Sequence, residues 1–565
     1  MSAPVNRWFI LVLVCVAQFM VVLDATIVNV ALPSIQHGLH FSATSLQWVV
    51  NVYTLFFGGF LLLGGRAADL FGRQRLFLAG IALFTSASLL NGIAGSSSIL
   101  IGGRALQGLG AALVSPAALS IVMTTFAEGR ERTKALGIWS AIAAGGGAVG
   151  LIVGGVLTTE LSWRWVFFIN LPIGIVAFVL GLRYIHNTRA EQRPETVDVM
   201  GATTVTAGLL VLVYDIVKAQ EYGWTSARTL GLFVVAVALL VAFVLTELRS
   251  KAPLIRLGIF RVRSLTSANG AMMFVAAGLF SMFYFASLYV QEVLHYSALK
   301  AGFGFVPVTF GIVIGAGLAQ PLIRIIGPRA LPVIGIAIAA TGLILLSRIP
   351  THGVYLTDLL PGLAIMSIGM GLTFVPVTLL ATTNIDASDA GLASGLFNTS
   401  QQVGGALGLA ILSSIAASRT SGEHGVTHAA ALVDGYQLAF LVGAGFMLLG
   451  IATIVGLVRS RDVTAIATPT GRRGCARLMV EAIQIRLRAD AQRNLELILE
   501  AARAVFAEDG LDASVADVAE RAGVGTATIF RRFPTKDDLV AAILEQELTA
   551  VATRARLAAG SDDPG

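Results

Sequence analysis

The chain has 565 residues, of which 56% are hydrophobic and 13% carry a charge, and its formal net charge is +6. Soluble domains contain charged residues at about twice that frequency, roughly 25%. This composition excludes a soluble enzyme and indicates a chain that lies mostly within a membrane.

Fourteen long apolar runs follow one another between residues 8 and 458. A membrane-spanning helix needs about 20 predominantly apolar residues, and each run approaches or exceeds that length. The predicted spans are 8–30, 46–66, 76–95, 99–126, 135–158, 165–185, 200–218, 229–248, 266–291, 301–323, 331–348, 357–381, 393–417 and 436–458. We therefore predict an all-α, polytopic membrane protein with 14 transmembrane helices.

Two long polar connections, 186–199 and 249–265, set the seventh and eighth helices apart from the rest. The natural division is six helices, a central pair and six helices, and halves of six helices are typical of alternating-access transporters. We expect an N-terminal bundle at 1–186, a central pair at 187–264, a C-terminal bundle at 265–460, a basic linker at 461–491 and a soluble segment at 492–565.

The basic residues of the loops predict the orientation. If the N-terminus is cytoplasmic, the inner loops and tails up to Arg473 contain 21 Lys and Arg, whereas the outer loops contain 6. Cytoplasmic loops carry the excess of Lys and Arg. We therefore expect a multi-pass protein of the cell (inner) membrane with both the N- and the C-terminus in the cytoplasm.

The first run contains a lone carboxylate, Asp24, within LDATIVNVALP, and the fourth contains Arg104. At a rise of 1.5 Å per residue, Asp24 lies about 24 Å from the inner end of its helix and Arg104 roughly 9 Å below the outer face. In a hydrocarbon core about 30 Å thick, both fall in the outer half at similar depth. Because intramembrane charges are costly, we expect a functional pair in which Asp24 loads and unloads a proton. A static pair that only orients two helices is the alternative.

The turn between the second and third spans reads GGRAADLFGRQR (64–75). Gly65 and Gly72 allow a tight crossing, while Asp69, Arg73 and Arg75 can bind opposite charges or helix ends on the facing half. A charged loop that only obeys the orientation rule is the alternative, but the Gly–Asp–Gly–Arg spacing exceeds what that rule requires.

Glycines recur every four residues in the fifth span, at Gly146, Gly150 and Gly154, and Gly155 follows. Such spacing presents a flat strip for close helix contact. We expect Gly150 to lie at the interface between the two six-helix halves, and generic helix packing is the alternative.

Polar side chains inside the spans are candidates for a central cavity. They are Asn29, Asn51, Gln107, Asn269, Asn398 and Gln402. Most intramembrane Asn and Gln residues form hydrogen bonds between helices, so each of them can equally be structural. Asp215 and Asp358 lie near helix ends, where snorkelling toward the interface is the simplest interpretation.

Six segments together resemble the signature set of the major facilitator superfamily, in its fourteen-helix drug:proton antiporter branch. They are LDATIVNVALP (23–33), GGRAADLFGRQR (64–75), RALQGLGAAL (104–113), GAVGLIVGG (147–155), WRWVFFINLPIG (163–174) and SGLFNTSQQVGGALG (394–408). The resemblance implies the major facilitator fold, with 64–75 as an inward gate latch. Two positions depart from the family pattern, because Leu151 stands where a proline is usual and Gln401 where a basic residue is common.

The resemblance also implies a function, namely export of amphipathic drugs or related small molecules by alternating access, driven by inward protons through Asp24 and Arg104. Besides the lipid bilayer, protons and a small amphipathic substrate are then the expected partners, with the proton gradient in place of a cofactor, and we expect a monomer. A dedicated exporter of one endogenous metabolite, lipid or siderophore is the alternative. The sequence has no GxxxxGK[ST] loop for ATP, no metal-ligand pattern and no nucleophile with its base, so we expect neither an ATP-driven pump nor an enzyme.

After the last span the composition changes. A basic connector, 461–491, can lie along the anionic inner leaflet. Apolar residues at Leu495, Ile498, Leu499, Ala502, Val505 and Phe506 then mark one helix face. Ser514 and Asp517 predict a capped start for the short helix SVADVAERA, and the turn AGVG (522–525) leads into TATIFRRF.

This helix-turn-helix pattern is similar to the DNA-binding domain of TetR-type repressors over residues 492–545. The resemblance implies that Thr526, Thr528, Arg531 and Arg532 face the DNA groove and that Lys536 faces a phosphate. The chain ends before the helical domain through which such repressors dimerise, and residues 492–565 carry 8 basic against 13 acidic residues. Both features weaken DNA binding. We interpret the tail as a truncated relic of a neighbouring regulator joined to the exporter, or as a translation-frame artefact. A membrane-tethered transcriptional regulator is the alternative from another functional class.

Overall fold

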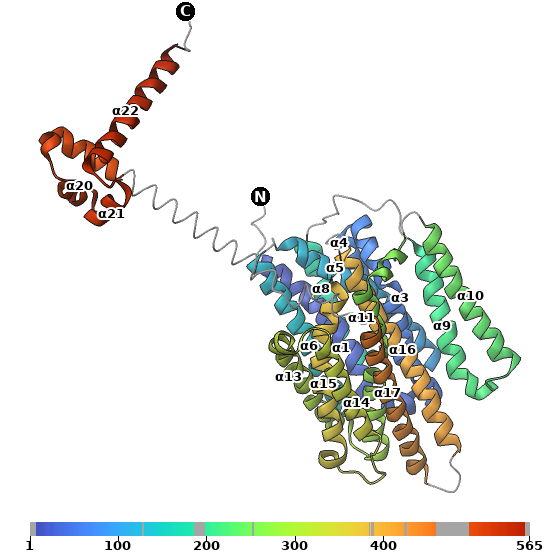
Figure 1. Cartoon of the computed structure of the whole chain (residues 1–565). Helices are drawn as coiled ribbons and strands as arrows, with labels where there is room; N and C mark the ends of the chain where they lie inside the picture. Colours follow the sequence, from blue (N-terminus) through green and yellow to red (C-terminus); the bar gives the residue numbers. More distant parts are fainter. Residues whose placement is uncertain are drawn as a thin grey trace, which may run out of the picture. The chain divides into compact units, whose positions relative to one another are not determined.

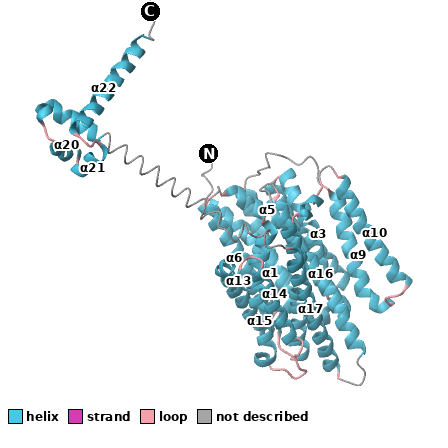
Figure 2. Cartoon of the chain, viewed as in Figure 1, coloured by secondary structure: helices cyan, strands magenta, loops and turns pink. Residues whose placement is uncertain are grey.

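The computed structural model describes residues 7–126, 129–185, 198–250, 253–383, 385, 389–422, 427–458 and 497–559. The chain divides into two compact units, Met1–Ala467 and Thr468–Gly565, and each is described by itself. Within these described ranges the regular structure is helical throughout (Figures 1 and 2).

The first unit begins with a six-span bundle. Its helices are α1 (Arg7–Leu39), α2 (Ala43–Leu46), α3 (Trp48–Phe71), α4 (Arg73–Gly92), α5 (Ser97–Thr125), α6 (Arg130–Glu160), α7 (Trp165–Phe168) and α8 (Asn170–Tyr184). The short helices α7 and α8 together form the sixth span, Trp165–Tyr184.

A hairpin of two helices, α9 (Val199–Tyr222) and α10 (Ala227–Arg249), stands at one side of this unit (Figure 1). Helix α9 packs on α3 and α16, whereas α10 packs mainly on α9. Large apolar side chains of α10 are exposed, among them Phe233, Val234 and Val241. Because such a contiguous apolar surface is rare on soluble proteins, the outer face of α10 is suited to contact with lipid.

The second six-span bundle follows. Its helices are η1 (Leu257–Arg261), α11 (Arg263–Leu288), η2 (Tyr289–Val293), α12 (Ala298–Gly304), α13 (Val306–Ile326), α14 (Ala330–Leu346), η3 (Tyr355–Leu359), α15 (Leu360–Thr382), α16 (Ala390–Gly422) and α17 (His428–Leu457). The predicted span 301–323 is divided at Phe305, because Pro307 stands in the first turn of α13 and has no N–H to continue α12.

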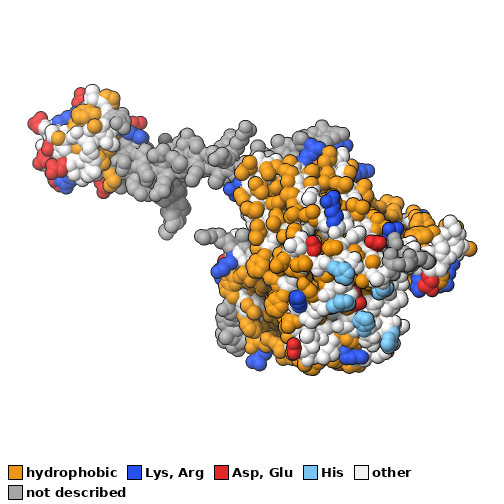
Figure 3. Space-filling model, turned by 90° about the horizontal axis from the view of Figure 1, so that it is seen from below, with side chains coloured by type: hydrophobic (Ala, Val, Ile, Leu, Met, Phe, Trp, Pro, Cys, Tyr) orange, Lys and Arg blue, Asp and Glu red, His pale blue; other side chains and the backbone are white. Residues whose placement is uncertain are grey.

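Twelve helices of the described residues are long and apolar enough to cross a membrane. Two shorter apolar helices, Gly145–Glu160 and Ala330–Leu346, correspond to the predicted spans 135–158 and 331–348. All fourteen predicted spans are therefore helical, and the prediction of an all-α polytopic membrane protein is confirmed. Hydrophobic side chains cover much of the surface of this unit in the view of Figure 3.

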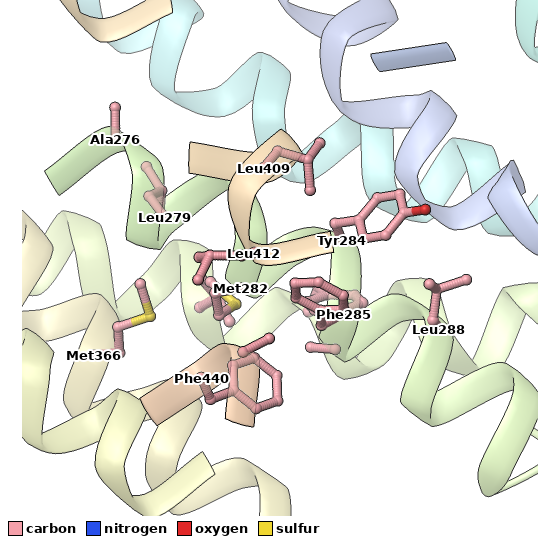
Figure 4. Close-up of a cluster of buried hydrophobic side chains, with 14 of the residues drawn as sticks. Ala276, Leu279, Met282, Tyr284, Phe285, Leu288, Met366, Leu409, Leu412 and Phe440 are labelled. Carbon is pink, nitrogen blue, oxygen red and sulfur yellow. The ribbon is translucent and has the colours of Figure 1, made fainter. Parts of the chain in front are cut away.

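Helix α11 lies at the centre of the second bundle. Its side chains meet those of α15, α16 and α17 in one buried cluster, which includes Met282, Phe285, Met366, Leu412 and Phe440 (Figure 4). These five side chains are at most 2% exposed. Dense apolar packing of this kind makes the bundle a rigid body.

Helix α1 contains Pro33, which has no N–H, so the carbonyl of Asn29 lacks its usual intrahelical donor. The hydroxyl of Ser287 on α11 donates to that carbonyl at 2.7 Å. One turn on, Gln291 Nε2 of the π-helix η2 donates to the carbonyl of Val30 at 3.0 Å. The last third of α1 is thus joined to the opposite six-helix half around Asn29 and Val30.

The tail unit is a small helical bundle. Residues 497–509 are helical and precede η5 (Gly510–Asp512), α20 (Val515–Ala522), α21 (Thr526–Arg532) and α22 (Lys536–Ala559). The predicted cap is confirmed, because the Ser514 and Asp517 side chains form a reciprocal capping box at the start of α20. Gly523 ends α20 in the left-handed conformation with φ of 64°. The core contains Ile498, Val505, Val518, Ile529 and Leu539; Leu495 lies outside the described residues.

Candidate functional site: a buried ion pair and its neighbours

Asp24 and Arg104 form a direct ion pair. Arg104 Nη1 on α5 donates to Asp24 Oδ2 on α1. The side chain of Asp24 is fully buried and that of Arg104 is 1% exposed. A buried pair with few competing waters is held by strong electrostatic attraction, but breaking it leaves an uncompensated charge.

The second carboxylate oxygen of Asp24 accepts two hydrogen bonds. Gln107 Nε2 and Asn170 Nδ2 each lie 2.9 Å from Asp24 Oδ1. Gln107 comes from α5, one turn after Arg104, and Asn170 is the first residue of α8. The carboxylate is therefore bound by one cation and two amides, all of them donors suited to its charged form.

The guanidinium of Arg104 is also held by groups other than Asp24. Its Nε donates to the backbone carbonyl of Val49 at 2.9 Å, and its Nη1 donates to Gln107 Oε1 at 2.9 Å. Its central carbon lies 4.2 Å from the ring centroid of Tyr53 and 5.9 Å from that of Phe167. Aromatic faces attract a desolvated cation, so Arg104 keeps favourable contacts independent of the carboxylate.

Two polar residues of α4 extend the network behind the pair. Ser88 Oγ accepts from Gln107 Nε2 at 2.6 Å, and Asn91 Nδ2 donates to Gln107 Oε1 at 2.6 Å. Ser88 also accepts from Asn170 Nδ2 at 3.4 Å. Both α4 side chains are fully buried. Gln107 is therefore held at both ends of its amide, and the site joins α1, α3, α4, α5 and α8.

Sequence reasoning missed Ser88, Asn91, Asn170 and Tyr53 as parts of this site. The signal was present, because Ser88 and Asn91 lie inside the apolar run 76–95 and Asn170 inside the run 165–185. Polar residues at such positions mark interhelical contacts.

Of the predicted cavity residues, Gln107 is the one that the described contacts bring to the ion pair. The other three asparagines donate to groups within four residues along the chain. Asn29 donates to the carbonyls of Ala25 and Thr26, Asn51 to the side-chain oxygen of Gln47, and Asn398 to the carbonyl of Ser394. Gln402 packs beside Gly58 of α3, where an added Cβ would lie 2.7 Å from the Gln402 Cβ. Asn269 accepts from Ser400 at 2.8 Å and so joins α11 to α16.

The predicted gate turn lies between α3 and α4. Gly72 has φ of 103°, which side chains rarely adopt, so glycine is required there. Gly65 faces Pro116, and an added Cβ would lie 3.7 Å away. Arg73 is half-buried and Arg75 is exposed, while the side chain of Asp69 lies outside the described residues.

The turn has a further contact through the neighbouring residue Arg66. Its Nη2 donates to the carbonyl of Pro253 at 3.4 Å, on the segment that leads from α10 into the second bundle.

The glycines of the fifth span contact two different neighbours. Gly146, Gly150 and Gly154 face α1, where added Cβ atoms would lie 3.2 Å from Val22, 2.1 Å from Thr26 and 2.8 Å from Ile27. The expectation that Gly150 lies between the halves is therefore wrong, because α1 belongs to the same half. Gly155 is turned by about 100° from Gly154 and faces α12 instead, with an added Cβ 2.7 Å from the carbonyl oxygen of Ala298.

The two acidic residues assigned to helix ends differ. Asp358 accepts from the backbone N–H of Val354 at 2.7 Å and so caps its helix start. Asp215 is 4% exposed within α9, so the snorkelling interpretation is wrong for it. Its position along the sequence alone does not reveal this burial.

In the tail, Thr526, Thr528 and Arg532 are exposed on α21, while the side chain of Arg531 lies outside the described residues. Lys536 Nζ donates to the carbonyl of Leu511 and lies 5.7 Å from the ring of Phe506. One of its three donors is therefore used inside the tail rather than offered to a phosphate.

Comparisons with known proteins match both units. Residues 14–409 match the family model of the Major Facilitator Superfamily, and residues 498–543 match that of the tetR family of bacterial regulatory proteins. The puromycin resistance protein pur8 of Streptomyces alboniger is 41% identical over 474 residues, covering 81% of this chain and 93% of that protein. The cephamycin export protein CmcT of Amycolatopsis lactamdurans is 41% identical over 466 residues, covering 82% and 94%.

Solved structures show the same fold at low identity. A bacterial homologue of the human lysosomal transporter Spinster has a TM-score of 0.59 at 16% identity, covering 82% of this chain and 98% of that chain. A peptide transporter POT has a TM-score of 0.58 at 18% identity, covering 79% and 95%. On its family match and its close relatives, the chain belongs to the Major Facilitator Superfamily, as a membrane transporter with a tetR-family helix-turn-helix segment at its C-terminal end.

Proposed function

We propose that this transporter exports amphipathic drugs or related small molecules in exchange for inward protons, by alternating access between its two six-helix halves. The observation that carries the proposal is the fully buried Asp24, bound by Arg104 deep inside the first bundle. An ionisable pair inside a membrane domain is costly to keep, which favours a functional role.

The coupling step follows from the pair's electrostatics. While Arg104 contacts Asp24, the cation favours the charged carboxylate. If a substrate or a helix movement draws Arg104 away, the buried carboxylate loses its counter-charge and takes up a proton instead. The contacts of Arg104 with the Val49 carbonyl and the ring of Tyr53 hold the cation to α3, so a movement of α1 away from α3 would separate Asp24 from its counter-charge.

The relatives support the direction and class of transport. Their names describe puromycin resistance, cephamycin export, tetracenomycin C resistance and export, and multidrug resistance. We infer export from the cytoplasm, with both termini on the cytoplasmic side of the cell membrane and the monomer as the transporting unit. Since several relatives are named for a single compound, such as puromycin or tetracenomycin C, dedicated export of one metabolite is a second candidate.

Everted membrane vesicles test the proposal. Addition of a dye or antibiotic to energised vesicles should release protons from the lumen and accumulate the compound, and Asp24→Asn should abolish both. Asp358→Asn is the matched control, because it neutralises a carboxylate that caps a helix outside the pair. Accumulation that persists without a proton gradient would overturn proton coupling, and accumulation of one compound from a broad panel would favour the dedicated exporter.

A further inference from the structure

Asn170 contacts the ion pair from a break in the sixth span. Helix α7 ends at Phe168 and α8 begins at Asn170, so the side chain projects from the first residue of a helix. Asn170 is fully buried. Its Nδ2 lies 2.9 Å from Asp24 Oδ1, and this bond joins α8 to α1. Asn170 is therefore as close to the carboxylate as Gln107 is.

The two amides differ in what their oxygen atoms do. Gln107 Oε1 accepts from Arg104 and Asn91, and Gln107 Nε2 donates to Asp24 and Ser88. Turning that amide over would break all four bonds. Asn170 Oδ1 is buried and has no hydrogen-bond partner, so turning Asn170 over sacrifices bonds of its Nδ2 alone.

A carboxamide presents a donor on one side and an acceptor on the other. A charged carboxylate can only accept, whereas a protonated carboxyl group must donate its O–H to an acceptor. A buried polar group left without a hydrogen-bond partner destabilises the protein. A carboxyl group that changes charge in a closed site therefore needs a neighbour able to serve both forms.

We propose that Asn170 is a positioning residue that serves both protonation states of Asp24, donating through Nδ2 to the carboxylate and, turned over, accepting the carboxyl O–H through Oδ1. The inference rests on the proposed function of Asp24 as the proton carrier and adds the residue that keeps the carboxyl group hydrogen-bonded in each state. No change of backbone is required, because rotation about the last side-chain torsion exchanges the two atoms.

The other groups around Asp24 do not offer this exchange. Arg104 from α5 has donors only, and the Tyr53 hydroxyl from α3 donates to the carbonyl of Val21 at 3.4 Å. Ser88 from α4 donates its hydroxyl to the carbonyl of Phe84 at 2.8 Å. Among the described contacts, Arg104 and Tyr53 are the charged and titratable groups facing Asp24, while α4 and α8 contribute uncharged side chains.

Asn170→Leu tests the inference, because leucine has similar size and neither donor nor acceptor. Efflux in everted vesicles is measured against pH, and the melting temperature of the purified full-length protein is measured on both sides of the efflux midpoint. A charge-assisted bond is stronger than a neutral one, so the midpoint should rise by about one pH unit. The melting temperature should fall on both sides, and further on the alkaline side.

Two further variants make each outcome decisive. Asn269→Leu removes a buried amide remote from Asp24, and it should lower the melting temperature equally at both pH values without moving the midpoint. Asn170→Gln should restore part of the midpoint shift. If Asn170→Leu behaves like Asn269→Leu, the role of Asn170 is structural only. If the melting temperature of Asn170→Leu falls on the alkaline side alone, Asn170 serves only the charged form of Asp24. Either result overturns the inference while Asp24→Asn still tests proton coupling separately.

Discussion

Arg104 Nε donates to the backbone carbonyl of Val49 at 2.9 Å while Nη1 of the same guanidinium binds Asp24. The arginine thus joins α5 to α3 through the Val49 carbonyl, which never changes charge. It joins α5 to α1 through the Asp24 carboxylate, which can be protonated. This division makes the carboxylate the variable partner of the pair, and the variants of the two residues should differ accordingly.

Asp24→Asn should abolish proton-coupled efflux while the protein still inserts and folds. The amide keeps the size of the carboxylate and can still bind Gln107 or Asn170, but it cannot exchange a proton. Dye efflux and luminal pH in vesicles, with membrane amounts matched by immunoblot, provide the measurement. Unchanged proton-coupled efflux at neutral external pH would remove Asp24 from the mechanism.

Arg104→Ala should impair transport and also destabilise the protein, since removing one partner of a buried pair costs about 3–5 kcal/mol. The double variant with Asp24→Asn should cost little beyond either single change, because residues that act as a unit are not additive. Melting temperatures and efflux of the two single variants and the double variant form the cycle. Independent, multiplying losses would show that the ion pair is not the coupled unit.

Gly155→Ala should slow efflux, because its Cβ would lie 2.7 Å from the carbonyl oxygen of Ala298 and 2.8 Å from the Cα of Leu299. Overpacking of a close contact costs about 1–3 kcal/mol, and this contact lies between the two halves. Gly145→Ala is the control, because an added Cβ there meets nothing within 4 Å. Equal efflux by the two variants would show that closure of the halves does not need the Gly155 contact.

Ending the chain at Ala467 should leave efflux unchanged, because the second compact unit begins at Thr468. The full-length and shortened chains are compared at matched expression in a dye-efflux assay. In parallel, fragment 468–565 is tested for binding to the promoter of its own gene. Loss of efflux, or sequence-specific nanomolar binding at physiological salt, would contradict the relic interpretation and favour a membrane-tethered regulator.

The tail should lose stability in acid. Hydrogen bonds from Arg521 lower the pKa of Glu508, and hydrogen bonds from the side chain and backbone of Ser514 lower that of Asp517. A lowered carboxyl pKa adds stability above the unfolded-state pKa, and this stability disappears as the pH falls through the folded-state value. The melting temperature of fragment 468–565 should therefore be level near neutral pH and decline below about pH 4. Glu508→Gln should flatten the decline; a wild-type melting temperature constant down to pH 3 would refute the assignment.

The sequence was sufficient for the spans and for the depth of the ion pair. Both depend on a fixed rise along each helix, so counting residues from Trp8 to Asp24 and from Ser98 to Arg104 placed the two charges at one level. Which helices surround that level depends on lateral packing. Asn170 follows Asp24 by 146 positions, and no spacing along the chain reveals that Asn170 and Gln107 donate to the same carboxylate oxygen of Asp24.

The difference between position along a helix and packing between helices also explains the two wrong predictions, for Gly150 and Asp215. The four-residue period of Gly146, Gly150 and Gly154 correctly indicates one helix face. Whether that face meets α1 or the opposite half is a question of neighbours, and a shift of one position, to Gly155, changes the answer. Asp215 is near a helix end along the chain, yet only 4% of it is exposed.

Pro33 gives the seam between α1 and α11 a property that an uninterrupted helix would lack. The Asn29 carbonyl has no helical N–H to satisfy it, so its acceptor capacity is directed to Ser287 across the seam. When the halves part, a water molecule can replace the serine hydroxyl at that carbonyl with nearly the same enthalpy. Opening then exchanges one hydrogen bond for another and leaves α1 wound. The proline thereby allows the hydrogen bond between Ser287 and Asn29 to be exchanged reversibly for one to water. This suits an interface that must close and reopen in every transport cycle.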